Sequence, residues 1–174
     1  RLKLDDPRKA RDHFSEAVAR AAPGRKEKTE NSRNKGSGKN KNVHHEAVEK
    51  TGDGDDKVYE PALVRLAETH AALLEWEASE RRNEEIHKRF PKTAIATQAK
   101  FGRGWALENL RKYDDAIALF REVVALKERD PLSARCQLHI GECLFGQKKF
   151  DEAFIELVRV QTTYRMPEWA AKAL

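Results

Sequence analysis

Two nine-residue stretches of the chain read almost alike, and this similarity constrains the fold more than any other feature of the sequence. Residues 112–120 are KYDDAIALF, and residues 149–157, which lie 37 positions further along, are KFDEAFIEL. At the same offset small residues match small ones and large apolar residues match large apolar ones. The matched pairs are Gly104 and Gly141, Leu107 and Leu144, Tyr113 and Phe150, Ala116 and Ala153, Phe120 and Leu157, and Val123 and Val160. Packing conserves volume in this way, so the sequence predicts a repeat architecture.

Helical periodicity covers most of the chain, and no alternating strand pattern competes with it. Charged residues make up 36% of the 174 positions, and Gly (9) and Pro (6) are few, which is typical of a helix-rich protein. The sequence therefore predicts an all-α fold of helical hairpins. The expected helices cover 6–22, 58–74, a segment that ends at Phe90, about 93–110, about 113–128, about 132–146, about 149–164, and a start at Met166.

Residues 23–57 interrupt this periodicity. Their stretch GRKEKTENSRNKGSGKNKN contains no large apolar residue, so it cannot bury enough surface to offset the entropy of ordering it. We expect a disordered basic and polar insertion that ends in an acidic turn at TGDGDD. The net charge of +5 originates here, because segment 24–42 carries seven cations against two acids. The cations are Arg25, Lys26, Lys28, Arg33, Lys35, Lys39 and Lys41.

The matched positions resemble the tetratricopeptide repeat, whose helix pair carries a Gly in the first helix and an aromatic, an Ala and large residues in the second. This pattern falls on Gly104, Tyr113, Ala116, Phe120 and Val123, and again on Gly141, Phe150, Ala153, Leu157 and Val160. The pair at 58–90 matches more loosely, with Ala67 at the Gly position and Ala78 at the Ala position. Ala10, Phe14 and Ala17 match the second helix of an earlier repeat. Arg103 departs from the pattern, because the family places a buried Leu there.

The resemblance implies a right-handed superhelix of antiparallel helix pairs, a TPR-like α-solenoid. The implied units are 1–22 (a helix of an earlier repeat), the insertion 23–57, the repeats 58–91, 93–130 and 131–165, and the start of a further repeat at 166–174. The period of 37 exceeds the basic family period of about 34. Runs such as RFPKTAIATQAKFGRGWAL resemble the longer-period repeats of bacterial cell-envelope proteins, among them the Tol-Pal-associated periplasmic protein and the lipoprotein of the outer-membrane assembly machine. This resemblance favours a periplasmic or envelope location, with the cytoplasm as the alternative. The chain begins at Arg1 without a Met, so we expect a fragment of a longer protein.

The first helices of such repeats line a concave groove, and the resemblance assigns nine groove residues. They are Gln98, Phe101, Trp105, Glu108, Asn109, Arg135, Leu138, Glu142 and Phe145. Exposed aromatic residues anchor peptide partners, which makes Trp105 and Phe145 the most informative of them. The alternative is that Phe101, Leu138 and Phe145 pack between adjacent helices, and the sequence leaves both open.

No pattern indicates catalysis, a cofactor or a metal. The sequence has no phosphate-binding Gly loop, nucleophile elbow or paired carboxylates. His44-His45 reads as a solvated pair, Asp53, Asp55 and Asp56 as a turn and helix cap, and His70 and His139 as interhelical histidines. Cys136 and Cys143, two helical turns apart, lie too far from each other for a disulfide and read as buried apolar residues.

The function predicted is therefore a non-catalytic scaffold that binds a protein or peptide in its groove. The alternative is binding of nucleic acid or another polyanion through the basic segment 24–42. That segment lacks interleaved aromatic residues, and Asn, Gly and Ser dilute its lysines, which favours a soluble insertion over a nucleic-acid arm.

Overall fold

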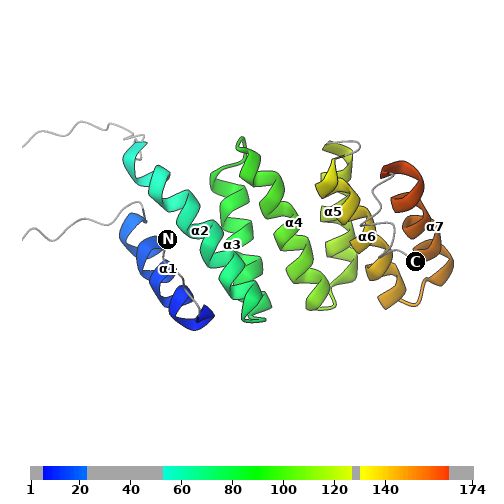
Figure 1. Cartoon of the computed structure of the whole chain (residues 1–174), viewed down its shortest axis with the longest axis horizontal. Coiled ribbons are helices and arrows are strands. Elements are labelled where there is room, and N and C mark those ends of the chain that lie inside the picture. Colours follow the sequence, from blue (N-terminus) through cyan, green and yellow to red (C-terminus); the bar gives the residue numbers. More distant parts are fainter. Residues whose placement is uncertain (1–5, 23–52, 127–129, 165–174) are drawn as a thin grey trace, which may run out of the picture.

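The computed structural model describes residues 6–22, 53–126 and 130–164, and these residues form an all-α solenoid of antiparallel helix pairs (Figure 1). The helices are α1 (Pro7–Ala21), α2 (Asp53–Ala72), α3 (Trp76–Arg89), α4 (Ala94–Asn109), α5 (Tyr113–Leu126), α6 (Pro131–Gly146) and α7 (Phe150–Arg159), followed by a π-helical turn (Val160–Tyr164). Residues 23–52 of the predicted insertion 23–57 and the predicted further repeat at 166–174 lie outside the described residues.

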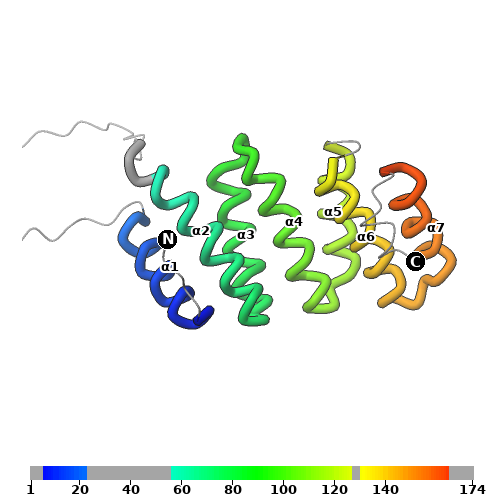
Figure 2. The backbone as a smooth tube through the Cα atoms, viewed as in Figure 1, coloured from blue at the N-terminus to red at the C-terminus, as the bar shows by residue number. Residues whose placement is uncertain are grey.

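The helices stand side by side in the order of the sequence (Figure 2). Each packs on the helix before it and the helix after it, and α4 also contacts α2 and α6. We refer to α2–α3, α4–α5 and α6–α7 as the first, second and third pairs. We call the contact between the first and second pairs the first interface, and that between the second and third pairs the second interface. One apolar cluster joins α1 to α4 and another joins α4 to α7, so the two cores meet at α4.

The backbone repeats the period of 37 residues through all three pairs. Each pair turns through one residue in the left-handed region, and these residues are Leu74 (φ 59°), Arg111 (φ 59°) and Lys148 (φ 65°). The next amide closes the first helix with a bond that spans the turn, as left-handed caps do. These bonds run from Glu75 N to His70 O, from Lys112 N to Leu107 O and from Lys149 N to Leu144 O, each at 2.9 Å. The sequence showed this period only in the last two pairs.

The shared period corrects the alignment of the first pair. Ser79, and not Ala78, lies 37 residues before Ala116 and is fully buried against the first helix. Its hydroxyl donates a hydrogen bond to Ala67 O at 3.1 Å, which satisfies the only polar group that the side chain brings into the contact. Ala67 is buried at the Gly position, as the sequence suggested. The sequence did not indicate Ser79 as a small core residue because its side chain is polar.

The predicted end of the insertion also changes at the start of α2. The sequence predicts an insertion that reaches residue 57 with an acidic turn at TGDGDD, which is wrong from Asp53 onward because α2 already begins there. The side chain of Asp56 forms an ion pair with Arg89 of α3, with 3.5 Å between Asp56 Oδ1 and Arg89 Nη2. An acidic residue in the first turn suits the helix dipole, which is consistent with an earlier start.

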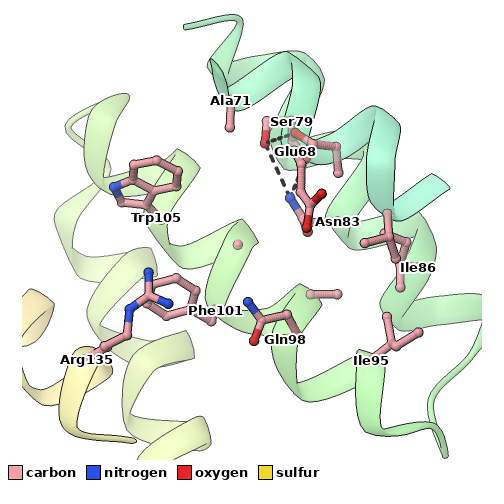
Figure 3. Close-up of a pocket in the computed structure, with 14 residues that line it drawn as sticks. Glu68, Ala71, Ser79, Asn83, Ile86, Ile95, Gln98, Phe101, Trp105 and Arg135 are labelled. Carbon is pink, nitrogen blue, oxygen red and sulfur yellow. Dashed lines mark hydrogen bonds between the residues drawn. The ribbon is translucent and has the colours of Figure 1, made fainter. Parts of the chain in front are cut away.

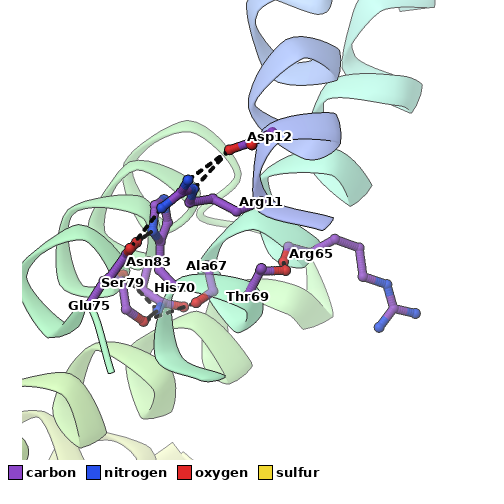
Figure 4. Close-up of polar contacts among 9 residues, drawn as sticks. All are labelled: Arg11, Asp12, Arg65, Ala67, Thr69, His70, Glu75, Ser79 and Asn83. Atoms are coloured by element: carbon purple, nitrogen blue, oxygen red, sulfur yellow. Dashed lines mark hydrogen bonds and ion pairs between the residues drawn. The ribbon is translucent and has the colours of Figure 1, made fainter. Parts of the chain in front are cut away.

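The insertion does not separate α1 from the array. Arg11 Nη1 of α1 pairs with Glu75 Oε1 at the α2–α3 turn at 2.9 Å, and Glu75 Oε2 lies 2.6 Å from His70 Nδ1 (Figure 4). Val18 and Ala21 of α1 are buried in the same cluster as Leu63 of α2. Helix α1 therefore stacks on α2 as the second helix of an earlier pair would.

Arg103 also finds its explanation in the packing. Its Nε lies 2.8 Å from Glu80 Oε1 and its Nη2 lies 3.4 Å from Glu84 Oε1, both on α3. The charge of this residue is therefore accepted by carboxylates of the preceding helix. Position 103 still makes an interhelical contact, but an ionic one in place of an apolar one.

The two cysteines behave as core residues. Cys136 and Cys143 are free and fully buried in α6. Desolvation raises the pKa of Cys136 to about 12 and raises the pKa of Cys143 further still. Both thiols are therefore protonated at neutral pH and chemically quiet.

Candidate partner-binding groove

Four of the nine predicted groove residues surround one pocket. Gln98, Phe101 and Trp105 of α4 and Arg135 of α6 line a cavity of about 150 Å³ that opens between α2, α3 and α4. Trp105, Phe101 and Arg135 stand at one side of it, and Ile86 and Ile95 at the other (Figure 3). The remaining walls come from Val64, Ala67, Glu68, Ala71, Ser79, Asn83, Ala99 and Gly102. A small number of polar groups in a mostly apolar wall is the usual composition of a binding pocket.

Trp105 forms the exposed rim of this pocket. Its side chain keeps 37% of its surface exposed and meets the ring of Trp76 edge to face, with 5.3 Å between the centroids. The backbone carbonyl of Trp105 accepts a hydrogen bond of 2.8 Å from the side chain of Asn109, which is itself exposed. Packing on Trp76 holds the indole in one orientation while leaving one face available to a partner.

The inner wall of the pocket is polar but internally satisfied. Asn83 is buried, and its Nδ2 donates to Ser79 O at 2.9 Å and lies 3.4 Å from Ser79 Oγ. Its Oδ1 lies so close to α4 that a methyl group on Gly102 would be 2.6 Å away. A side chain at position 102 would therefore require the amide of Asn83 to move. Neither Asn83 nor Gly102 stood out in the sequence, although the 37-residue register would have placed Asn83 at the position of Phe120.

Two of the predicted groove residues belong to the core. Phe101 is 3% exposed and Leu138 is 4% exposed, so both are core residues, although Phe101 also lines the wall of the pocket. The guanidinium of Arg135 lies 4.4 Å from the centroid of the Phe101 ring and covers it. These two residues follow the packing alternative because the apolar stripe of a first helix is shared between the groove and the core.

Phe145 lies apart from the pocket. It is 62% exposed near the end of α6 and meets Phe150 of α7 edge to face, with 5.2 Å between the centroids. Its side chain therefore packs at the α6–α7 turn. An aromatic pair at this turn does not extend the pocket at Trp105.

The two remaining groove residues, Glu108 and Glu142, converge on His139. The imidazole Nδ1 lies 2.8 Å from Glu108 Oε2 and 2.9 Å from Glu142 Oε2. Burial alone would lower the pKa of His139, but the two carboxylates outweigh it and raise the pKa to about 9. His139 is therefore a charged residue at neutral pH that ties α6 to the end of α4.

This triad is also the set among the described residues whose donor atoms are grouped closely enough to hold a metal ion, all within 4.8 Å of one another. A metal would have to displace the proton of an imidazole that two carboxylates stabilise in its charged form. The charges and the short N–O distances are those of an ion triad, and we interpret the arrangement as one.

The helical array and its groove agree with the comparison to known families. The family model described as tetratricopeptide repeat matches residues 61–130 and again residues 101–161. The chain belongs to the tetratricopeptide repeat family. Repeats of this family generally mediate protein–protein interactions, and its members are typically non-catalytic scaffolds. No curated protein matches the chain at a significant level.

In the part of this tetratricopeptide repeat protein that the structure describes, every helix is too short or too polar to span a bilayer. The basic segment 24–42, on which the nucleic-acid alternative rested, lies outside the described residues. Among the described residues, the pocket at Trp105 is a candidate binding site.

Proposed function

We propose that this tetratricopeptide repeat protein is a scaffold that holds a peptide segment of a protein partner in the groove formed by α2, α4 and α6. The observation that carries the proposal is the pocket bounded by Trp105, Phe101, Gln98 and Arg135. It lies where first helices of neighbouring pairs meet, and its rim carries an exposed, orientated indole. Tryptophan and arginine beside an apolar pocket are the residue types that dominate binding energy at protein interfaces.

The remaining groove residues receive different roles in this proposal. Gln98 and Asn109 are exposed on α4 and would meet the partner's backbone. Glu108 and Glu142 are committed to His139, and Phe101 and Leu138 support the groove from below. Binding energy is then concentrated at one pocket and is not spread over all nine positions.

A peptide selection tests the proposal. Random peptides displayed on phage are selected on the full 174-residue chain, and the enriched sequences are measured by fluorescence anisotropy. Trp105→Ala should weaken their binding at least about tenfold, as expected for an aromatic anchor. The matched control is Trp76→Ala, which destroys the same aromatic pair but removes no wall of the pocket. Equal losses in both variants, or no enrichment at all, would contradict the proposal.

A place in a bacterial cell-envelope assembly is the narrower form of this proposal. Its support is the 37-residue period and its resemblance to the longer repeats of envelope proteins. Fractionation of cells that express the natural gene with a C-terminal tag tests it. Recovery of the protein in the cytoplasm would separate the scaffold function, which would stand, from the location, which would not.

A further inference from the structure

The two interfaces of the array place different side chains at equivalent positions. In the second pair Phe120 of α5 is fully buried, and a methyl group on Gly104 would lie 2.7 Å from its Cε1. In the third pair a methyl group on Gly141 would likewise lie 2.6 Å from Leu157 Cδ2. The residue 37 positions before Phe120 is Asn83, which is smaller and turns toward Gly102. Of the three equivalent positions 83, 120 and 157, only position 83 therefore lacks a large apolar side chain.

The opposing helix shows the same difference. His139 of α6 stacks on Phe120, with ring centroids 5.4 Å apart and an interplanar angle of 20°. The residue 37 positions before His139 is Gly102, which has no side chain. Two stacked rings thus fill the second interface at the place where the first interface has only an amide and a glycine. The pocket occupies this place in the first interface.

The wall chemistry excludes most other occupants. Asn83 Nδ2 is already bonded to Ser79, and buried apolar lining residues include Ala67, Ile86, Ala99 and Phe101. The charged lining residues are Glu68, which is exposed and paired with Arg65, and Arg135, whose guanidinium lies over the Phe101 ring. A charged side chain among the buried apolar walls would lose its hydration without gaining a partner there. The volume of about 150 Å³ is comparable to an apolar cavity that holds one benzene molecule.

We propose that the pocket binds a single phenylalanine or leucine side chain of the partner peptide, the residue types with which the chain itself fills the equivalent positions. This inference rests on the proposed scaffold function and adds the chemistry of the partner's anchor. The anchor would stand where Phe120 stands one repeat later, with Trp105 and Gln98 beside the peptide backbone that carries it.

The test fills the pocket with the side chains that the later pairs carry at the position equivalent to Asn83. Asn83→Phe copies Phe120 into the first pair, and Asn83→Leu copies Leu157 as a second, smaller variant should the first fail to fold. Asn83→Ala is the matched control, because it loses the same hydrogen bonds but leaves the pocket open. The probes are N-acetyl-phenylalanine amide, N-acetyl-leucine amide and N-acetyl-lysine amide, followed by methyl NMR on Ala67, Ala71, Ile86 and Ile95 of the full chain.

We expect saturable shifts of these methyl signals in the millimolar range with the phenylalanine and leucine probes and none with the lysine probe. The shifts should persist in Asn83→Ala and disappear in the filled variants, which should also bind the selected peptides at least about tenfold more weakly. Absence of saturable shifts in the natural chain would overturn the inference, as would peptides that bind the filled variants unchanged. In the latter case the groove would still bind peptides, so the scaffold function would survive. Probe binding without any peptide binding would support the pocket and contradict the scaffold.

Discussion

The first and second interfaces join helix pairs of the same backbone design, but their interiors are filled differently. The turn within each pair recurs every 37 residues with one residue in the left-handed region and the same closing hydrogen bond. Yet the second interface is filled by the stacked rings of Phe120 and His139, whereas the first contains a pocket beside Asn83 and Gly102. The difference teaches that the repeat geometry does not depend on filling this position. One unit can therefore keep the architecture while leaving a pocket in its interior.

The first helices of the two pairs differ by a methyl group at the position that faces this place. In the second pair Gly104 leaves room for the ring of Phe120, which would touch any added side chain. In the first pair Ala67 replaces that glycine, and its methyl lines the pocket. The smaller Asn83 leaves the pocket open, and its amide donates to Ser79, which is absent from the later pairs.

The difference between the two interfaces is tested most strongly by truncating the side chain at the equivalent position of each. Phe120→Ala removes a fully buried ring from the second interface and should cost about 3–5 kcal/mol of unfolding free energy. Asn83→Ala at the equivalent position should cost only about 1 kcal/mol, because it removes one net hydrogen bond beside an existing pocket. Urea unfolding followed by circular dichroism measures both. Equal costs would mean that the two interfaces are packed alike.

A second prediction sharpens the comparison through pH, because only the second interface holds the His139 triad. The pKa of His139 in the folded chain is about 9, above its unfolded value of about 6.5. Its contribution is therefore fully present below about pH 6.5 and is lost as pH rises through 9, with an upper limit of about 3 kcal/mol. The urea midpoint should fall between pH 6.5 and pH 9.5.

The control for this pH dependence is His139→Gln, which cannot carry the charge. Its urea midpoint should start lower at pH 6.5 and change much less as the pH rises. Hydrogen exchange should localise the loss in the natural chain to α4 and α6, since Glu108 and Glu142 lie on these helices. A fall of equal size in the variant would assign the pH dependence to other groups.

The smallest predicted effect extends the comparison to the third pair. Phe154 lies 37 positions after Ile117, but it is 68% exposed, whereas Ile117 is 6% exposed and packs in the core that includes α6. Phe154→Ala should change the unfolding free energy by less than about 0.5 kcal/mol. Ile117→Ala should cost about 2–5 kcal/mol in the same assay. A large cost at Phe154 would show that its face is covered in solution.

The sequence by itself determined the architecture. The spacing of Gly104, Ala116 and Phe120, repeated 37 positions later, is a pattern of volumes that only stacked helix hairpins satisfy, so the helices and the family could be read directly. The sequence also placed Gln98, Trp105 and Arg135 in one groove region, and they do border one pocket. Periodicity succeeds here because the face of a helix follows from its 3.6-residue turn alone.

The tertiary structure decided how deep each of these residues lies. Phe101 shares the helical stripe of Trp105, and Leu138 holds the equivalent position on α6, but both are buried, and the Arg135 guanidinium covers the Phe101 ring. Periodicity cannot tell a groove residue from a core residue on one stripe. Ser79 and Asn83 looked like ordinary polar helix residues until the turns fixed their register. The pocket itself is a missing volume, set by Asn83, Ala67 and Gly102 from three helices. No single residue encodes such a cavity, which forms only when the helices that surround it pack together.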